Sequence, residues 1–258
     1  MQFTILGSGS AGNCAYLETP ETRVLIDCGF SAKQIRQRLA SIGRTPENLT
    51  GILVTHEHID HIHGLGVLAH KLNIPVYCNR ATHDAIRFQF NVKIDCRLFA
   101  TGGSFDLGDV HVETFSIPHD AQDPVGYVLR AGSASVAFLT DLGHMTKLVT
   151  ERVRTANVLV LEANHDVKLL QDCPHRPWSL KQRILGRHGH LSNAAAADAI
   201  ADVMSANLQH LFLGHLSREC NKPALAHAAV MQRLEQIGAS HLPTTVASQD
   251  TPCPTLSL

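Results

Sequence analysis

Short apolar runs, rich in branched and aromatic residues and separated by turn residues, recur along the chain and predict β-strands. They lie at residues 3–6, 15–17, 24–26, 52–54, 76–77, 110–115, 127–129, 136–139, 158–161 and 211–213. Several of these runs are apolar throughout, which is typical of strands whose two faces are both covered. We therefore expect an α/β protein in which sheets pack on one another and helices lie outside.

Helical patterns lie between and after these runs. A helix is expected over residues 31–42, where Ser31 can cap its start and Gly43 its end. The other predicted helices cover residues 81–90, 178–187, 192–205 behind Ser192, and 223–237 from Pro223. Residues 1–245 are expected to form a single domain, and residues 246–258, rich in Thr, Ser and Pro, a flexible tail.

The composition is that of a globular protein. Of the 258 residues, 44% are hydrophobic and 17% charged, and no run approaches the roughly 20 apolar residues that span a bilayer. The N-terminal residues lack a basic leader, and the seven cysteines are scattered and never in Cys-x-x-Cys spacing. We therefore expect a cytoplasmic protein with reduced thiols and no membrane partner.

A cluster of metal-ligand side chains follows the apolar run at 51–54. Within six residues the chain places His56, His58, Asp60 and His61. Neutral imidazole is the commonest metal ligand, and carboxylate oxygen suits the same divalent ions. A solvated loop with chance histidines is the alternative, since the chain has 17 His. The position directly after a buried strand favours the metal site.

Three further side chains of ligand type each follow another predicted strand. His119 comes after the run at 110–115, Asp141 after 136–139, and His215 after 211–213. Each alone is an ordinary loop or turn residue. Together with the first cluster they make seven side chains, about the number that two metals with a bridging water require.

Positive charge is concentrated in one segment. Residues 168–190 carry five basic residues and one acidic residue, although the whole chain has a net charge of −1. The segment contains Arg176, Lys181 and Arg183 together with the only tryptophan, Trp178. Such a stretch suits contacts with phosphates and stacking on a base or sugar, and a solvated helix face is the alternative.

The chain resembles the metallo-β-lactamase-fold hydrolases over nearly its whole length. The resemblance rests on the His-x-His-x-Asp-His cluster, on the three later ligand-type residues in family order, and on residues 25–29 ahead of them. It implies an αββα sandwich with a metal cleft at one edge of the two sheets. One metal is expected on His56, His58 and His119, the other on Asp60, His61 and His215, with Asp141 bridging them.

Shorter motifs resemble one subgroup, the YycJ/WalJ-like proteins. They lie at residues 6–13, 116–121, 140–144, 161–166, 187–193 and 215–217. The subgroup is associated with DNA hydrolysis, including 5′→3′ exonuclease activity, and is near the phosphodiesterase branch that includes tRNase Z. The resemblance therefore implies a nuclease whose partner is nucleic acid, DNA before RNA. Two departures are Ala11, where a second serine is common, and residues 173–178, which replace a more tyrosine-rich loop.

The ligand set implies a hydrolytic mechanism. Two divalent metals, zinc by default with manganese or iron as alternatives, lower the pKa of a bridging water and supply hydroxide to attack phosphorus. Asp60 is expected to guide the proton of that nucleophile. His165 is the candidate acid for the leaving group, with Glu162 or Asp166 orienting its ring. The alternative for His165 is a loop histidine held by Asp166.

Other residues are candidates for substrate contacts or for support of the ligands. The glycine-rich residues 7–13 can approach a phosphate or the metal waters closely. In the family that the chain resembles this loop borders the cleft, which makes Ser10 and Asn13 candidate substrate groups or supports of the ligands. His190, Ser192 and Asn193 open a predicted helix, whose N-terminus favours an anion. The basic residues Arg176, Lys181 and Arg183 precede it. Asp27 is expected to hold a ligand histidine by a hydrogen bond instead of binding metal.

Two alternative functions remain open. One is a dinuclear hydrolase of a small molecule, such as a cyclic phosphodiester, thioester or lactone. The other is a non-catalytic regulatory protein that keeps metal for stability. DNA or RNA preference, strand polarity, exonuclease or endonuclease mode, metal identity and oligomeric state also stay open at this point.

Overall fold

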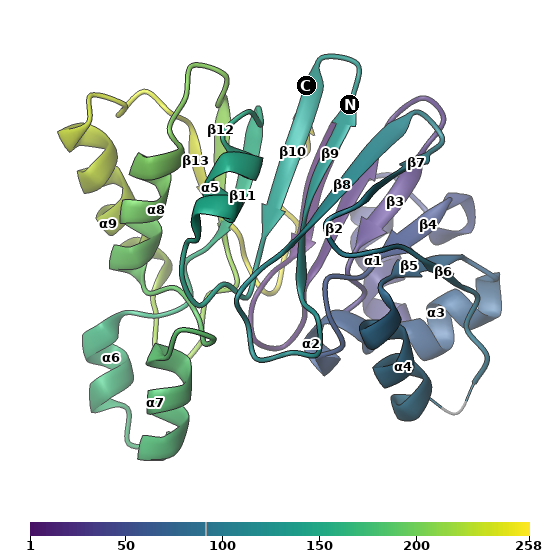
Figure 1. Cartoon of the computed structure of the whole chain (residues 1–258), viewed down its shortest axis with the longest axis horizontal. Helices are drawn as coiled ribbons and strands as arrows, with labels where there is room; N and C mark the ends of the chain where they lie inside the picture. Colours follow the sequence, from purple (N-terminus) through teal and green to yellow (C-terminus); the bar gives the residue numbers. More distant parts are fainter. Residues whose placement is uncertain (91) are drawn as a thin grey trace.

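Two β-sheets pack face to face, and helices cover the outer face of each (Figure 1). The computed structural model describes residues 1–90 and 92–258. Each sheet has seven strands and mixes parallel with antiparallel pairs. The predicted αββα sandwich is therefore confirmed.

The first sheet is built from the N-terminal half of the chain and closed by the C-terminus. In spatial order its strands are β14 (Leu256–Ser257), β1 (Gln2–Gly7), β2 (Cys14–Glu18), β3 (Arg23–Ile26), β4 (Gly51–Leu53), β5 (Val76–Cys78) and β6 (Cys96–Leu98). From β3 to β6 all neighbours are parallel. The carboxyl ends of these strands therefore lie at the same edge of the sheet.

The second sheet also has seven strands, but their numbers fall across the sheet where those of the first sheet rise. Its strands are β13 (Thr244–Val246), β12 (His210–Gly214), β11 (Val158–Glu162), β10 (Ala134–Leu139), β9 (Val125–Ala131), β8 (Val110–Ser116) and β7 (Ser104–Leu107). The four strands from β10 to β13 are parallel. Their carboxyl ends form the second edge at which ligand side chains can gather.

The helices are divided between the two outer faces. On the first sheet lie α1 (Ala32–Ser41), α3 (Leu65–Leu72) and α4 (Arg80–Gln89), and on the second lie α5 (Lys147–Val153), α8 (Asn193–Val203) and α9 (Pro223–Gln236). The short helices α6 (Val167–Asp172) and α7 (Trp178–Leu185) extend below the second sheet (Figure 1). We call residues 166–190, which contain α6 and α7, the basic arm. The remaining short elements are α2 (Ile59–Ile62) and the 3₁₀ turn Pro46–Asn48.

The apolar strands found in the sequence fill the space between the sheets. Phe3 of the first sheet meets Phe212 of the second edge to face, with ring centroids 5.8 Å apart. Tyr127 is fully buried in the same layer and donates its hydroxyl to the backbone oxygen of Val54 at 2.5 Å. Strands covered on both faces need such continuous apolar runs, and these are the runs that predicted them.

Several elements have no counterpart in the predictions. The strands β6, β7, β13 and β14 and the helices α2, α3, α5 and α6 were not expected. Helix α3 shows the reason, because it contains Gly66, a poor helix former. A Cβ atom there would lie 2.8 Å from the Phe90 ring, so packing between helices overrides the local preference.

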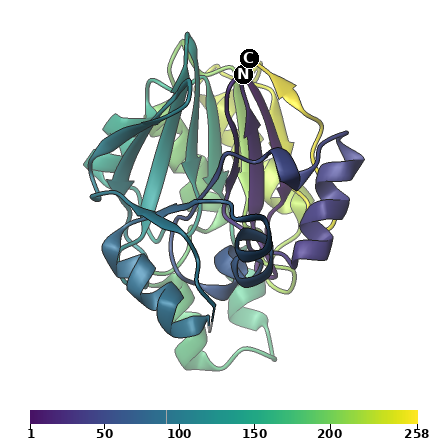
Figure 2. The same cartoon turned by 90° about the vertical axis from the view of Figure 1, so that its right-hand side faces the viewer.

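The predicted flexible tail is wrong for residues 246–258. Strand β14 pairs with β1, and Cys253 is buried with its amide bonded to the Ile5 oxygen at 2.9 Å. The N-terminal amine donates to the Leu258 oxygen at 3.0 Å, so the two termini lie together, as Figure 2 shows. Small polar residues and prolines are here held by strand pairing, which composition does not reveal. Among the helices described, none combines the length and apolarity needed to cross a membrane.

The same C-terminal segment also fastens the glycine-rich loop of residues 9–12. The Gln249 side chain accepts from the Ala11 amide at 2.9 Å and donates to the Gly12 oxygen at 2.7 Å. Its backbone oxygen accepts from Arg38 at 3.0 Å. One buried amide thus joins the chain end to a loop beside the carboxyl edge of the sheets.

We predict that Gln249→Ala lowers the free energy of unfolding by about 1–3 kcal/mol, because the buried Gly12 oxygen and the partly buried Ala11 amide lose their partner. Amide hydrogen exchange of residues 9–12 should become faster. Gln236→Ala is the control, since the Gln236 side chain is exposed and accepts only from Arg233. Equal effects of the two substitutions on unfolding would contradict the assignment.

Candidate metal centre

Three side chains of the site sit directly after strands in a strained backbone conformation. Asp27 follows β3, Asp141 follows β10 and His215 follows β12, with φ angles of 61°, 58° and 56°. Positive φ is uncommon for residues other than glycine and costs roughly 1–3 kcal/mol. The positive φ angle at each of the three strand ends directs the side chain into the space between the two sheet edges.

The loop with the first ligand cluster is held by close backbone contacts. The Asp60 oxygen accepts from the Asn13 amide at 2.8 Å, and the His61 oxygen accepts from the Cys28 amide at 2.7 Å. A Cβ atom on Gly29 would lie 1.7 Å from the Asp60 oxygen. Only glycine therefore fits at position 29, which explains the glycine at the end of the motif over residues 25–29.

The first group of donors joins the loop after β4 to the loop after β8. Ligand atoms of His56, His58 and His119 lie within 4.8 Å of one another. The His58 Nδ1 atom is 3.3 Å from the His119 Nε2 atom. Residues more than 60 positions apart thus converge on one point with three imidazole nitrogens, a donor set that suits a divalent ion.

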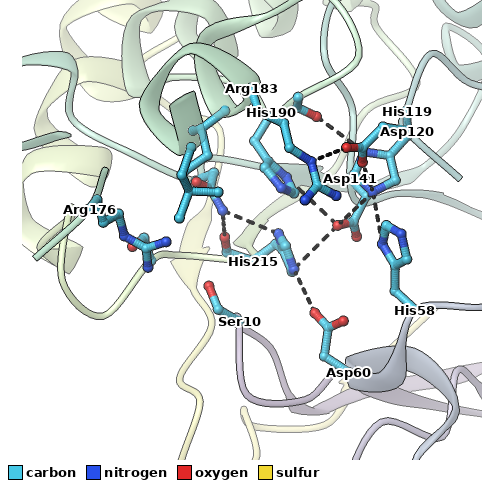
Figure 3. A pocket seen from close by; sticks show the side chains of 15 residues that line it. Ser10, His58, Asp60, His119, Asp120, Asp141, Arg176, Arg183, His190 and His215 are labelled. Carbon is cyan, nitrogen blue, oxygen red and sulfur yellow. Dashed lines mark hydrogen bonds and ion pairs between the residues drawn. The ribbon is translucent and has the colours of Figure 1, made fainter. Parts of the chain in front are cut away.

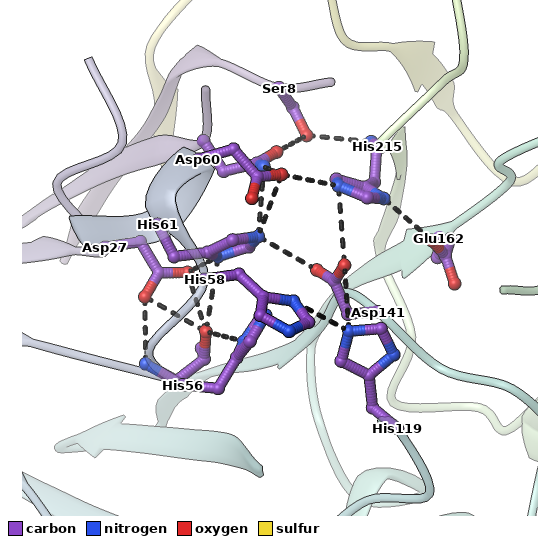
Figure 4. A network of polar contacts seen from close by, with 12 residues as sticks. Ser8, Asp27, His56, His58, Asp60, His61, His119, Asp141, Glu162 and His215 are labelled. Atoms are coloured by element: carbon purple, nitrogen blue, oxygen red, sulfur yellow. Dashed lines mark hydrogen bonds and ion pairs between the residues drawn. The ribbon is translucent and has the colours of Figure 1, made fainter. Parts of the chain in front are cut away.

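The second group lies next to the first. Ligand atoms of Asp60, His61 and His215 are also within 4.8 Å of one another. Asp141 lies between the groups, with carboxylate oxygens 3.1 Å from His61 Nε2, 3.4 Å from His215 Nε2 and 3.6 Å from His119 Nε2 (Figure 4). A carboxylate in this position can bridge two ions.

The site fits the metals that its residue types imply. Among the described residues, the buried atoms His56 Nε2 and Asp141 Oδ2 have no hydrogen-bond partner. A buried polar group without a partner costs about 1–3 kcal/mol, and a bound cation would satisfy both atoms. Five imidazoles and two carboxylates match zinc and also accept manganese or iron.

The charge states of His56 and Asp141 favour metal binding. Burial lowers the pKa of His56, so this imidazole is neutral and can donate its lone pair. Burial alone raises the pKa of Asp141, but the neighbouring His215 and His61 lower it well below its ordinary value. Asp141 is therefore a carboxylate, and its Oδ2 atom, although 3.1 Å from His61 Nε2, has no hydrogen-bond partner of good geometry in the described chain.

Asp27 supports this cluster from behind. The fully buried carboxylate accepts from the Thr55 amide at 2.8 Å and lies 2.7 Å from His61 Nδ1. A hydrogen bond at Nδ1 leaves Nε2 of His61 as the ligand atom and holds the ring in place. The structure thus brings Asp27 to a ligand histidine, as its sequence position suggested.

Glu162, at the end of β11, holds two histidines at once. One oxygen lies 2.7 Å from His190 Nδ1 and 2.8 Å from His215 Nδ1, and the other accepts from the amides of Leu142 and Leu191. Burial alone raises the pKa of Glu162, but His190 and His215 lower it to about 2. An ionised Glu162 thus orients one metal ligand and one imidazole that faces the cavity.

The structure does not support His165 as the acid. His165 is 1% exposed, and neither ring nitrogen has a hydrogen-bond partner in the described chain. Glu162 turns to His190 instead, and Asp166 accepts from the Leu169 amide and caps α6. The expectation that either carboxylate orients the His165 ring is therefore wrong. The loop after β11 buries His165, whereas His190 lines the cavity.

A cavity of about 190 Å³ opens over the two groups of donors (Figure 3). Four of the eight predicted substrate residues line it: Ser10, Arg176, Arg183 and His190. The polar residues Asp120, Asn164 and Ser217 line it too and were missed. Each lies within two residues of a predicted site residue, so proximity along the chain was the available signal.

The other four predicted substrate residues serve the fold. Asn13 is buried: its Oδ1 accepts from the Gly9 amide at 2.9 Å, and its Nδ2 lies 3.2 Å from His61 Nε2. Lys181 donates to the Gln171 oxygen at 2.6 Å. Ser192 caps α8, and Asn193 donates to Asn221 at 2.9 Å. These side chains do not line the cavity, because each makes hydrogen bonds to a backbone or buried polar group nearby.

The two arginines of the cavity are held by carboxylates on opposite sides. Arg183 pairs with Asp120, and Arg176 pairs with Glu219 at 3.1 Å. Trp178 is 62% exposed and does not line the cavity. The basic arm thus presents guanidinium groups, not its aromatic side chain, to the space above the donors (Figure 3).

A cleft of nitrogen and oxygen donors between two sheet edges, open to a cavity with arginines, defines a metal-dependent hydrolase. Residues 22–216 match the β-lactamase superfamily domain, so the chain belongs to this superfamily. It is 40% identical to the exodeoxyribonuclease YycJ of Bacillus anthracis over 92% of this chain and 90% of that protein. It is 41% identical to the exodeoxyribonuclease WalJ of Streptococcus pneumoniae over 91% and 88%.

A solved structure extends the comparison to the fold. The metallo-β-lactamase fold protein YhfI of Bacillus subtilis superposes with a TM-score of 0.73 over 98% of both chains, at 16% identity. At this identity the likeness concerns the fold alone. The predicted metallo-β-lactamase fold and the YycJ/WalJ-like relationship are both confirmed.

The buried imidazole of His165 gives a prediction for stability. Burial lowers its pKa to about 4, whereas an unfolded histidine titrates near about 6.5. The unfolded chain therefore takes up a proton first as the pH falls, so this contribution to stability is complete above about pH 6.5 and lost below it. The unfolding free energy falls when the pH is lowered from about 7 to about 5. We predict that this fall is about 2 kcal/mol smaller in His165→Leu than in the wild type.

The measurement is urea unfolding of metal-free wild type and variant at both pH values. The other histidines titrate in both proteins, so the difference between the two curves isolates His165. If the pH dependence is the same in both proteins, His165 is not buried as a neutral ring.

Proposed function

We propose that this protein is a dinuclear metal-dependent phosphodiesterase that degrades DNA as a 5′→3′ exonuclease. The observation that carries the proposal is the shared cavity of Figure 3, which two arginines line together with five of the seven donors. Guanidinium groups recognise phosphate, and metal donors at the same cavity place hydrolysis there. The exodeoxyribonuclease names of the two relatives support DNA as the substrate.

The metals would be held by the two groups described above. His56, His58 and His119 would bind one ion, and Asp60, His61 and His215 the other, with Asp141 between them. Two bound divalent ions supply Lewis acidity and lower the pKa of coordinated water. Zinc is the first choice for this donor set, and manganese or iron can replace it.

Asp60 would combine metal binding with control of a proton. Its side chain is 22% exposed, lines the cavity, and lies 3.4 Å from His215 Nε2. Burial alone raises the pKa of Asp60, but His61 and the hydrogen bond from His215 lower it well below its usual range. Asp60 is thus an ionised acceptor that can orient an attacking water by its proton.

His190 replaces His165 as the candidate acid for the leaving oxygen. It lines the cavity, and Glu162 occupies its Nδ1, which leaves Nε2 for the substrate. Burial alone lowers the pKa of His190, but Glu162 raises it above the ordinary value. A protonated imidazole beside the cleft can donate a proton to a departing alkoxide.

Arg176 and Arg183 would bind the phosphates on either side of the scissile bond. Both belong to the basic arm and line the cavity. Incoming phosphate would compete with Glu219 and Asp120 for these guanidinium groups. A cytoplasmic location, where thiols stay reduced, agrees with the seven free cysteines and is part of the proposal.

The direct test uses the metal-reconstituted protein with 5′- and 3′-labelled single- and double-stranded DNA and RNA. We expect mononucleotide release from the 5′ end of DNA, and about 10³-fold or greater loss of rate in Asp60→Ala and Asp141→Ala, because each removes a metal ligand. Unchanged cleavage in these variants would exclude the two-metal mechanism.

A small chromogenic phosphodiester separates the nuclease from a small-molecule hydrolase. Arg176→Gln and Arg183→Gln should weaken DNA cleavage and spare the small substrate, whereas Lys181→Gln should not show this split, because Lys181 faces away from the cavity. Two bound metals without any hydrolysis would instead favour the regulatory alternative.

The role of His190 is tested by the leaving group. We predict that His190→Ala lowers kcat about 10²–10⁴-fold on DNA, whose leaving alkoxide needs a proton, and much less on a nitrophenyl phosphodiester, whose leaving phenolate does not. His188→Ala is the matched control, because His188 is exposed in the same loop and its contact to Asp120 is through the backbone. Equal losses on both substrates would show that His190 only supports the structure.

A further inference from the structure

Two buried cysteines lie together behind the wall of the cavity. Cys173 ends α6 and is 7% exposed, and Cys220 follows β12 in the loop from His215 and is 1% exposed. With the carboxylate of Glu219, their sulfur atoms form a group whose ligand atoms all lie within 4.8 Å of one another. Cys173 is distant in sequence from the adjacent Glu219 and Cys220, and the folded basic arm brings it to them.

The surroundings of this group are apolar on the inner side. Leu170 and Ile184 pack with both cysteines, and Leu180 packs against the same cluster. Ile184 and Leu180 also line the cavity over the metal donors. The two thiols therefore lie directly behind the wall that the basic arm adds to the cavity.

The backbone holds both sides of the group in place. The Cys220 oxygen accepts from the Asp166 amide at 2.9 Å, and the Cys220 amide donates to Ser217 Oγ at 3.1 Å. Asp166 begins the basic arm, while Ser217 lines the cavity two residues after His215. The arrangement is thus fixed before any ligand binds, which lowers the entropy that binding costs.

The donor set differs in kind from that of the cleft. In the described parts of the chain, all other groups of three or more metal-type ligands draw on residues of the dinuclear cleft and its support, and none of them contains sulfur. Two sulfurs and one carboxylate oxygen suit zinc and other thiophilic ions, which take four ligands in tetrahedral geometry.

The charges around the group balance for a divalent ion. Two thiolates and the carboxylate carry three negative charges, the ion two positive ones, and Arg176 one more through its ion pair to Glu219 at 3.1 Å. Burial raises the pKa of Cys220, and Arg176 opposes this. Metal binding would release the thiol protons and leave a neutral site, as a buried position requires.

We propose that Cys173, Glu219 and Cys220 form a separate thiolate metal site that takes Zn²⁺ and fastens the basic arm to the loop of His215. The exposed Glu219 side chain, 53% accessible, gives the ion a path from solvent and leaves the fourth position for water. Metal here would fix Arg176 at the cavity, because Arg176 pairs with a ligand of the ion. This proposal is independent of the nuclease assignment.

Cadmium provides the test, because its bonds to sulfur absorb in the ultraviolet and its bonds to nitrogen and oxygen do not. Reduced, metal-free protein is titrated with Cd²⁺ alone. We expect a charge-transfer band that saturates at about one equivalent of sulfur-bound ion and is lost in Cys173→Ser and in Cys220→Ser. Cys96→Ser is the matched control: Cys96 neighbours Cys78 on the first sheet, and its loss should leave the band intact.

Glu219→Gln keeps the test decisive if a cysteine variant fails to fold, since Glu219 is at the surface. It should retain the band and weaken Cd²⁺ affinity at this site at least about tenfold. Asp141→Asn should retain the band with unchanged affinity, which separates this site from the cleft. A reduced wild type without the band, a band that persists without Cys173 or Cys220, or a band lost with Cys96 would overturn the proposal.

Discussion

The structure depends on one constraint: the buried carboxylate of Asp141 must lie among imidazoles at the centre of the donor cluster. Its oxygens lie 3.1–3.6 Å from three histidine nitrogens that come from three separate loops. Such crowding of donors is unfavourable without cations, because His56 Nε2 and Asp141 Oδ2 are buried without a hydrogen-bond partner in the described chain. Holding the donors there requires strained, positive φ angles at three strand ends and a glycine, Gly29, packed against the Asp60 backbone.

The sheets make this crowding possible. Parallel strands of both sheets end at the same edge of the sandwich, so loops distant in sequence deliver side chains to one point. The apolar layer between the sheets fixes their relative position, and the helices outside do not enter the site. Behind the donors, Asp27 and Glu162 fix the ring orientation of the histidines. The sandwich thus orients the donors, whereas the basic arm adds one wall of the cavity above them.

The chain end and the basic arm show how packing extends the site beyond the motifs. Residues 246–258 add a strand to the first sheet and hold the glycine-rich loop through Gln249. The basic arm brings Arg176, Arg183 and His190 over the donors and places two thiols behind them. The sequence showed the basic arm as a charged segment but gave no signal for the strand of the C-terminal segment or for the two thiols, because these depend on which face of a short helix or loop meets the sandwich.

The sequence pattern alone determined ten of the described strands and the seven donor residues, because apolar runs and ligand chemistry are local properties that survive in a linear pattern, and the family resemblance added the sandwich. His56, Asp141 and His215 could be chosen because each stands at the end of a run. Tertiary structure decided which neighbouring polar side chains reach the cavity: His190 does and His165 does not, and Arg183 does while Lys181 turns to a backbone oxygen. That choice depends on strand register and helix orientation, which are set by contacts between residues far apart in the chain.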